Sequence, residues 1–184
     1  MVLRYATVVF AAAVLATVVA LSVSALGPKE AGAATTTTVM TCGGGNVTLK
    51  VREQRTLKRH NRLRKNHGLR HLCVNRALTK AARTHSAEMV KKDYFGHNSY
   101  SGKGVGARLR RYGYDWRVYG ENIAGGAGRL GKPGPIFRRW MNSSHHRANI
   151  LKGRFRQVGV GIYRGNYKGQ RGYTMYTVDF GTQR

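Results

Sequence analysis

The spacing of apolar residues predicts helices through the first two thirds of the exported part of the chain. From Val47 the apolar positions recur at helical intervals, Leu57 lies on the inner face, and Gly68 is placed to end the helix. A second helix is expected from the N-cap Asn75 to about Lys92. Its inner stripe consists of Leu78, Ala81, Ala82, His85 and Met89.

The last part of the chain alternates between apolar and other residues, which is typical of strands. Residues 157–164 and 173–180 each place every second residue on one side, namely Val158, Val160 and Ile162, then Tyr176, Val178 and Phe180. With residues 165–172 as the connection, the two runs predict an antiparallel hairpin. Shorter helices are expected at 105–112 and 135–141, and a short strand at 120–124. The predicted fold class is therefore α+β, with helices packed around a small antiparallel sheet.

The N-terminal residues have the character of an export signal. Arg4 precedes an almost wholly apolar run from Tyr5 to Leu26, and cleavage patterns of small residues follow at 31–33 and 23–25. We therefore interpret residues 1–33 as a signal peptide. The apolar run is also about as long as a membrane span, roughly 20 residues, so an uncleaved N-terminal anchor is the alternative. In both cases the rest is secreted or extracellular, with residues 34–46 as a linker and 47–184 as one domain.

The charge of the chain is strongly unbalanced, with 33 Lys and Arg against 7 Asp and Glu. Without residues 1–33, which contain Arg4, Lys29 and Glu30, 31 basic and six acidic residues remain. This excess predicts attraction to acidic cell-envelope polymers or anionic lipid. Export argues against nucleic acid as the natural partner, and we expect a monomer.

The chain has two cysteines, Cys42 and Cys73. An even pair in an exported protein predicts a disulfide, which here would tie the N-terminal segment to the connection after the first helix. The spacing does not match a zinc site built on cysteines.

Six segments occur in an order that resembles a known family. They read H-N-R-L-R-K-N-H-G-L, L-T-K-A-A-R-T-H-S-A-E-M, Y-F-G-H, G-E-N-I-A, W-M-N-S-S-H-H-R-A-N-I-L and V-G-V-G-I-Y, before a closing Y-T-V-D-F-G. This order is similar to the CAP superfamily of cysteine-rich secretory, antigen 5 and pathogenesis-related 1 proteins, in its short bacterial extracellular form, also called the SCP domain. The resemblance runs from about Leu57 to Gly181 and implies an α-β-α sandwich.

The same resemblance implies a cleft, which the larger family lines with two histidines and two glutamates. His97 matches the first histidine and Glu121 the first glutamate. Ser143 stands where the second glutamate is expected, and Met175 stands where the second histidine is expected. Half of the family's set is therefore replaced, and we expect Ser143 and Met175 to line the cleft instead.

Bacterial members resembling this chain carry a histidine in an S-x-H-R segment, which makes His146 the third member of a reduced site with His97 and Glu121. His145 should point away or to the rim. Two neutral imidazoles and a carboxylate suit zinc or a similar divalent ion, and the same groups suit a metal-free polar cleft with a proton-transferring histidine.

Two function classes follow. The first is a secreted binding module, with a cleft for a small apolar or ionic ligand and a basic surface for the envelope. The second is a metal-dependent hydrolase acting on envelope polymers or peptides. The incomplete set of cleft residues favours the first.

Overall fold

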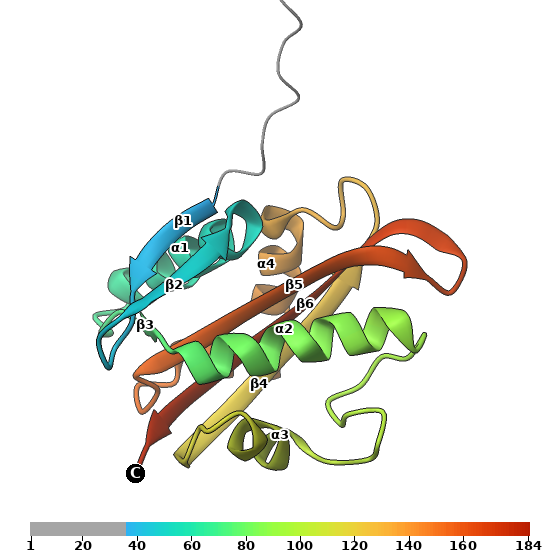
Figure 1. Ribbon diagram of the computed structural model, residues 1–184. Helices are drawn as coiled ribbons and strands as arrows, with labels where there is room; N and C mark the ends of the chain where they lie inside the picture. The colour runs from blue at the N-terminus through green and yellow to red at the C-terminus, as the bar shows by residue number, and fades with distance from the viewer. Residues whose placement is uncertain (1–35) are drawn as a thin grey trace, which may run out of the picture. The chain divides into compact units, whose positions relative to one another are not determined.

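The computed structural model describes residues 36–184, and the predicted signal peptide or anchor lies outside the described residues (Figure 1). Along this range the chain forms β1 (Thr36–Met40), β2 (Asn46–Lys50), α1 (Val51–Asn66), β3 (Cys73–Val74), α2 (Arg76–Lys91), α3 (Val105–Arg111), β4 (Trp116–Gly126), α4 (Pro133–Asn142), α5 (Ser144–Leu151), β5 (Gln157–Tyr167) and β6 (Gln170–Gln183). None of the helices within residues 36–184 has both the length and the apolar character needed to cross a bilayer.

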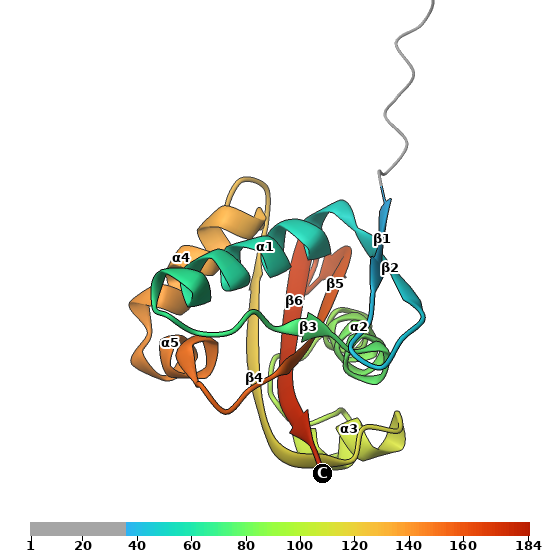
Figure 2. The same cartoon turned by 90° about the vertical axis from the view of Figure 1, so that its left-hand side faces the viewer.

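The central sheet has the strand order β3-β5-β6-β4. Strands β5 and β4 each pair antiparallel with β6, and the short β3 pairs parallel with β5. Seen from the side, α1, α4 and α5 cover one face of the sheet and α2 covers the other, with α3 near the end of that second face (Figure 2). The α+β prediction, helices around a small sheet, is confirmed.

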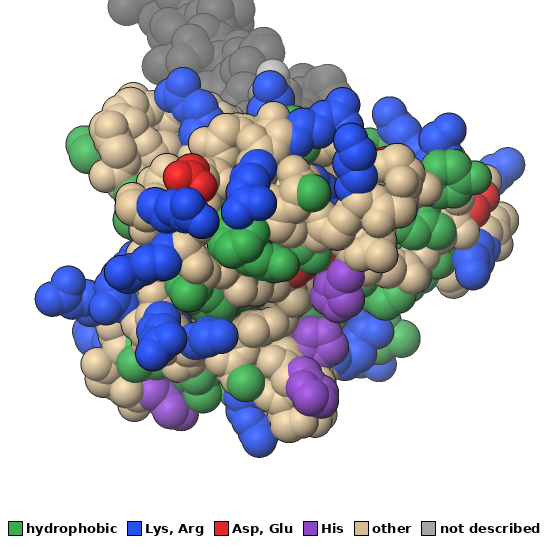
Figure 3. Space-filling model, turned by 90° about the horizontal axis from the view of Figure 1, so that it is seen from below, with side chains coloured by type: hydrophobic (Ala, Val, Ile, Leu, Met, Phe, Trp, Pro, Cys, Tyr) green, Lys and Arg blue, Asp and Glu red, His purple; other side chains and the backbone are tan. Residues whose placement is uncertain are grey.

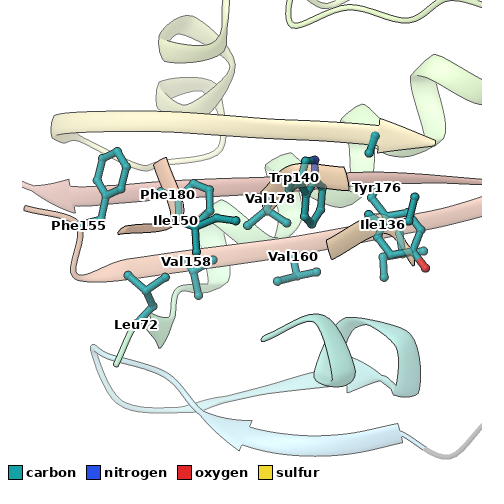
Figure 4. Packing of buried hydrophobic residues seen from close by; sticks show 12 residues of the cluster. Leu72, Ile136, Trp140, Ile150, Phe155, Val158, Val160, Tyr176, Val178 and Phe180 are labelled. Atoms are coloured by element: carbon teal, nitrogen blue, oxygen red, sulfur yellow. The ribbon is translucent and has the colours of Figure 1, made fainter. Parts of the chain in front are cut away.

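The two faces of the sheet have different compositions, which we call the apolar face and the glycine face. On the apolar face the predicted side chains pack against α1, α4 and α5, and Trp140 and Ile136 of α4 and Ile150 of α5 are fully buried there (Figure 4). This cluster includes Val158, Val160, Ile162, Tyr176, Val178 and Phe180.

The glycine face lets α2 approach the sheet closely. Gly159 and Gly161 of β5 alternate with the buried valines, and a Cβ on either would lie 2.1 Å from a main-chain carbon of α2. Next to them β6 presents Thr177 and Asp179, both with no exposed surface. The helix therefore rests on strand backbone, since no side chain from these glycines separates the two.

Several predicted boundaries are corrected by the structure. Residues 36–40, assigned to a linker, form β1 and pair with β2, so that the first helix begins at Val51 and not at Val47. The final hairpin turns at Lys168 and Gly169, which both have positive φ, and the connection is much shorter than 165–172. The second helix begins as predicted, because the Asn75 side chain accepts a hydrogen bond from the Leu78 N–H.

The predicted disulfide is confirmed. Cys42 follows β1 and is bonded to Cys73 at the start of β3. The backbone is joined at the same place, since the Cys42 N–H donates to the carbonyl of Val74. The β1–β2 hairpin is therefore fixed to the edge of the central sheet by a covalent bond and by main-chain hydrogen bonding.

Candidate functional site

The candidate site is built on β4, which is the edge strand of the central sheet. Glu121 lies in the middle of this strand, pairs in register with Asp179 of β6, and has a side chain that is 1% exposed. Its Oε1 accepts a hydrogen bond of 2.7 Å from Nδ1 of His97, in the loop after α2. Its Oε2 forms an ion pair with Arg108 of α3. Both carboxylate oxygens of Glu121 are therefore engaged.

The charge of Glu121 is maintained by these partners. Burial alone raises the pKa of this carboxyl, but the hydrogen bond from His97 and the positive charge of Arg108 outweigh burial, so the pKa lies below its ordinary value. Arg108 also donates to the carbonyl of His97, at 2.9 Å. The same guanidinium thus fixes the carboxylate and the loop that carries its histidine partner.

His146 reaches the site from the other side of β4. It lies on α5, and its Nδ1 is 2.8 Å from Oγ of Ser143, the residue that precedes the helix. Two amides attach α5 to β4: Asn122 donates to the carbonyl of His146, and Asn149 donates to the carbonyl of Glu121. The helix covers the outer edge of the strand, which an edge strand would otherwise leave open to pairing.

The surroundings of His146 lower its pKa. The pKa of His146 is lowered first by partial burial, and then by the neighbouring charges of His97 and His145. His97 has half of its side chain exposed, at 52%, and His145 is exposed, as predicted for a rim residue. Histidine side chains gather side by side on one face of the molecule, between basic and hydrophobic side chains (Figure 3).

A hollow of about 370 Å³ adjoins His146. We call it the aromatic pocket; it is lined by Phe95, Ala124, Gly125, Arg139, Trp140, Ser143, His146, Tyr167 and Tyr173. The rings of Tyr167 and Tyr173 lie 4.7 Å apart, and Phe95 is 52% exposed. Its walls therefore combine aromatic surface with an arginine and a histidine, and they include Ser143 but neither His97 nor Glu121.

Met175 does not line the cleft, contrary to the prediction. Its side chain is fully buried with Met89, Val90 and Ile123, between the sheet and α2. The reason is its register: Met175 pairs with Gly125, two places from Thr177, and so it points to the glycine face.

The arrangement does not fit the three-ligand metal shell suggested by the sequence. Oε1 of Glu121 contacts Nδ1 of His97 directly and Oε2 is paired with Arg108, so an ion shared with the two imidazoles would have to compete with both contacts. Among residues 36–184, no group of three or more His, Cys, Asp and Glu side chains is placed to hold a metal ion. What the site does offer is Nε2 of His97 and of His146, neither of which has a hydrogen-bond partner within that range.

Three polar residues of the site carried no assigned function in the sequence analysis. Arg108 and Asp179 are buried, and Asn149 is hydrogen-bonded to both Glu121 and Asn122. Neither carboxylate oxygen of Asp179 has a partner among the described residues, and burial, followed by the negative charge of Glu121, raises its pKa well above the ordinary value. Asp179 and Asn149 stand in the quoted segments Y-T-V-D-F-G and H-R-A-N-I-L, which was the available signal.

Comparison with known proteins agrees with this fold. The model of the cysteine-rich secretory protein family, CAP, matches residues 57–180. YkwD of Bacillus subtilis (strain 168) is 35% identical over 109 residues, which cover 59% of this chain and 41% of YkwD. This chain therefore spans less than half the length of that relative.

Two solved structures share the fold. An extracellular protein containing an SCP domain from Bacillus anthracis has a TM-score of 0.63 at 30% identity, over 72% of this chain and 40% of that one. An outer surface protein from Borrelia burgdorferi has a TM-score of 0.62 at 18% identity, over 82% of this chain and 100% of that one, which is a likeness of fold alone.

Proposed function

Because the chain belongs to the cysteine-rich secretory protein (CAP) family, we propose that it is an exported binding module that holds a small ligand in the cleft beside His97 and His146. The ligand carries an apolar part and an anionic group. The relative from Bacillus anthracis is described as extracellular, which supports export of this chain as well.

The observation that carries the proposal is the composition of the aromatic pocket. A volume of about 370 Å³ lies within the range of small-molecule sites, about 300–1,000 Å³. Phe95, Tyr167 and Tyr173 supply ring surface for an apolar group. Arg139 and His146 stand at the same pocket, where a carboxylate or phosphate can accept their hydrogen bonds.

The hydrogen bond from His97 to Glu121 fixes the orientation of the His97 ring beside the pocket. Because Nδ1 of His97 is hydrogen-bonded to the carboxylate, Nε2 is the ring nitrogen that remains for a ligand group. A carboxylate already paired with Arg108 has little tendency to leave its position when a ligand enters. In this proposal these residues orient a polar group of the ligand directly, and no bound metal ion is needed.

A comparison of the two adjacent histidines tests the proposal. Palmitate, which has an apolar chain and a carboxylate, is titrated into the wild type, His146→Ala and His145→Ala by calorimetry. We expect the first variant to bind at least about tenfold more weakly, a loss of roughly 1.4 kcal/mol, and the second to bind as the wild type does. Equal affinities for all three proteins would contradict the use of this pocket.

A zinc titration separates the second function class from the first. Stoichiometric zinc binding, together with hydrolysis of a peptide that is lost in Glu121→Gln, would replace the binding module by the metal-dependent hydrolase. If the purified protein contains no zinc and a calorimetric zinc titration gives no binding heat, the result agrees with the metal-free cleft.

The proposed envelope attraction rests on where the acidic residues lie. Among the six acidic residues of residues 36–184, three are buried: Glu53, Glu121 and Asp179. The basic side chains of the surface are therefore opposed mainly by Glu88, Asp93 and Asp115. A surface of this kind attracts acidic polymers and anionic lipid, and the attraction falls as salt is raised.

A further inference from the structure

A second hollow lies away from the cleft, where β2 meets α1 beside β5. We call it the junction pocket; it has a volume of about 430 Å³ and is lined by Lys50, Val51, Arg52, Arg55, Ile162, Tyr163 and Arg164. We propose that this pocket is the docking site for phosphate headgroups of an anionic phospholipid membrane. This proposal rests on the attraction to the cell envelope proposed above. It specifies the membrane as the binding partner and the junction pocket as the binding site.

The charge of the junction pocket is positive and uncompensated by its own lining. Lys50, Arg55 and Arg164 are exposed, whereas Arg52 is partly buried and donates to the carbonyl of Gly131. No acidic residue belongs to the lining. Phosphate oxygens are suitable acceptors for this group of cations, since arginine and lysine donate charge-assisted hydrogen bonds to phosphate.

The acidic residue that lies between Lys50 and Arg55 in the sequence already has hydrogen-bond partners. Glu53 stands in the first turn of α1 and is fully buried, with its oxygens bound by Arg83 at 2.9 Å and 2.6 Å. One of them also accepts the Lys50 N–H. Glu53 therefore neutralises Arg83, and the positive charge of Lys50 and Arg55 stays available to a ligand.

Part of the lining is apolar, which a site for a free inorganic ion does not need. Val51, Ile162 and the ring of Tyr163 form this part, and Lys91 lies over the same ring at 5.7 Å from its centroid. A tyrosine flanked by cations is typical of protein surfaces that meet the boundary between headgroups and acyl chains. The combination favours a lipid over a soluble polyanion.

The pocket also lies where the chain enters the domain. β1 begins at Thr36, which pairs in register with Lys50 (Figure 1). Nine residues, 27–35, separate Thr36 from the apolar run that ends at Leu26. Fully extended, they reach about 30 Å at roughly 3.3–3.6 Å per residue, so an N-terminal run held in a bilayer keeps Lys50 within that distance of the headgroups.

The chain contains a matched control at the other end of β5. Arg117, Arg154 and Arg156 surround a hollow of about 440 Å³ whose remaining lining residue is Val118. All three arginines are exposed, as are Lys50, Arg55 and Arg164. The two groups lie roughly 20–25 Å apart along the strand, at about 3.3 Å per residue, and equal numbers of charges can be removed from each.

The test compares two triple variants of residues 34–184, which contain the whole sheet and its core and form one compact unit. Binding is measured by co-sedimentation with vesicles of phosphatidylglycerol and phosphatidylcholine, against phosphatidylcholine alone. Lys50→Gln, Arg55→Gln, Arg164→Gln should weaken binding roughly 100-fold, since each cation near an anionic surface contributes about 1 kcal/mol. Arg117→Gln, Arg154→Gln, Arg156→Gln should change it less than about threefold.

Other results of the vesicle-binding experiment would contradict the proposal in different ways. Equal losses in the two variants would overturn the junction pocket and leave the general attraction of the surface standing. Binding to a soluble polyglycerol phosphate but not to vesicles would overturn the membrane as partner. If the first variant unfolds, Lys50→Gln with Arg55→Gln leaves intact the hydrogen bond from Arg164 to the Gly172 carbonyl and is expected to lose most of the binding.

Discussion

The two faces of the central sheet are covered by helices in opposite ways. On the apolar face, valine, isoleucine and aromatic side chains fill the space beneath α1, α4 and α5. On the glycine face, Gly159 and Gly161 let α2 lie against the strand, and the residues beside them are polar. The first face gains stability by burying apolar area, and the second combines close backbone packing with buried charge.

This difference explains where the site lies. Glu121 and Asp179 pair across β4 and β6 on the glycine face, whereas Asn122, the next residue, points to the side of α5 and binds His146. Alternation along one strand thus directs successive side chains to opposite faces. His97 therefore reaches β4 through Glu121 on one face, and α5 with His146 is attached to β4 through Asn122 on the other.

The largest effect should come from adding a methyl group on the glycine face. Gly161→Ala places a Cβ 2.1 Å from the main-chain carbon of Ala82, and backbone cannot yield as a side chain does. We expect a loss of about 4 kcal/mol in the free energy of unfolding, measured by denaturant titration. Gly43→Ala, which meets nothing within 4 Å, is the control and should be nearly silent.

The next effect concerns the buried ion pair of the same face. Arg108→Gln leaves the Glu121 carboxylate buried and without its counter-charge, which should cost about 3 kcal/mol of unfolding free energy. Removing Arg184, whose partner Asp115 is as exposed as itself at 66%, should cost less than about 1 kcal/mol. Similar losses for both variants would show that the Arg108 pair is no more important than a surface contact.

A smaller loss is expected on the apolar face. Val160→Ala removes two methyl groups from a side chain that is 2% exposed, which should cost about 2 kcal/mol. If this deletion costs more than Gly161→Ala does, the proposed contrast between the faces is wrong. Both variants are measured in one denaturant series.

The smallest effect is a pH dependence of stability from Asp179. Its folded pKa is raised, so its contribution is fully present below its unfolded pKa and is lost as pH rises through the folded pKa. Glu121, whose pKa is lowered, has the opposite dependence and loses its contribution as pH falls. The advantage of Asp179→Asn over the wild type in thermal midpoint should therefore grow from pH 4 to pH 8; a constant difference would contradict the raised pKa.

The sequence predicted elements whose periodicity is local and strong. The alternation of Val158, Val160 and Ile162 identified β5, and Asn75 identified the start of α2. β1 was missed because four threonines before Val39 suggest a polar linker, although β-branched residues also suit a short paired strand. α5 was missed because it buries only Ile150, which leaves no apolar stripe to detect.

The partners of the site were harder to predict, for a physical reason. The pair of His97 and Glu121 came from a resemblance, but the ion pair of Arg108 with Glu121 depends on how α3 docks on the sheet. An arginine in a short basic helix has the same local pattern whether it is buried or solvated. Met175 was misplaced for a similar reason: its face depends on register, and a shift of one residue reverses it.

The disulfide keeps the chain in one piece when its backbone is cut between the two cysteines. Cys42 and Cys73 enclose β2, α1 and the loop after it, so a single cut of the backbone anywhere from residue 43 to residue 72 leaves one molecule and not two fragments. Within that interval Arg64 binds the carbonyls of Ile150, Lys152 and Phe155, which hold the new ends in place. Outside a cell, where proteases are met, a single nick between residues 43 and 72 releases no peptide until the disulfide is reduced.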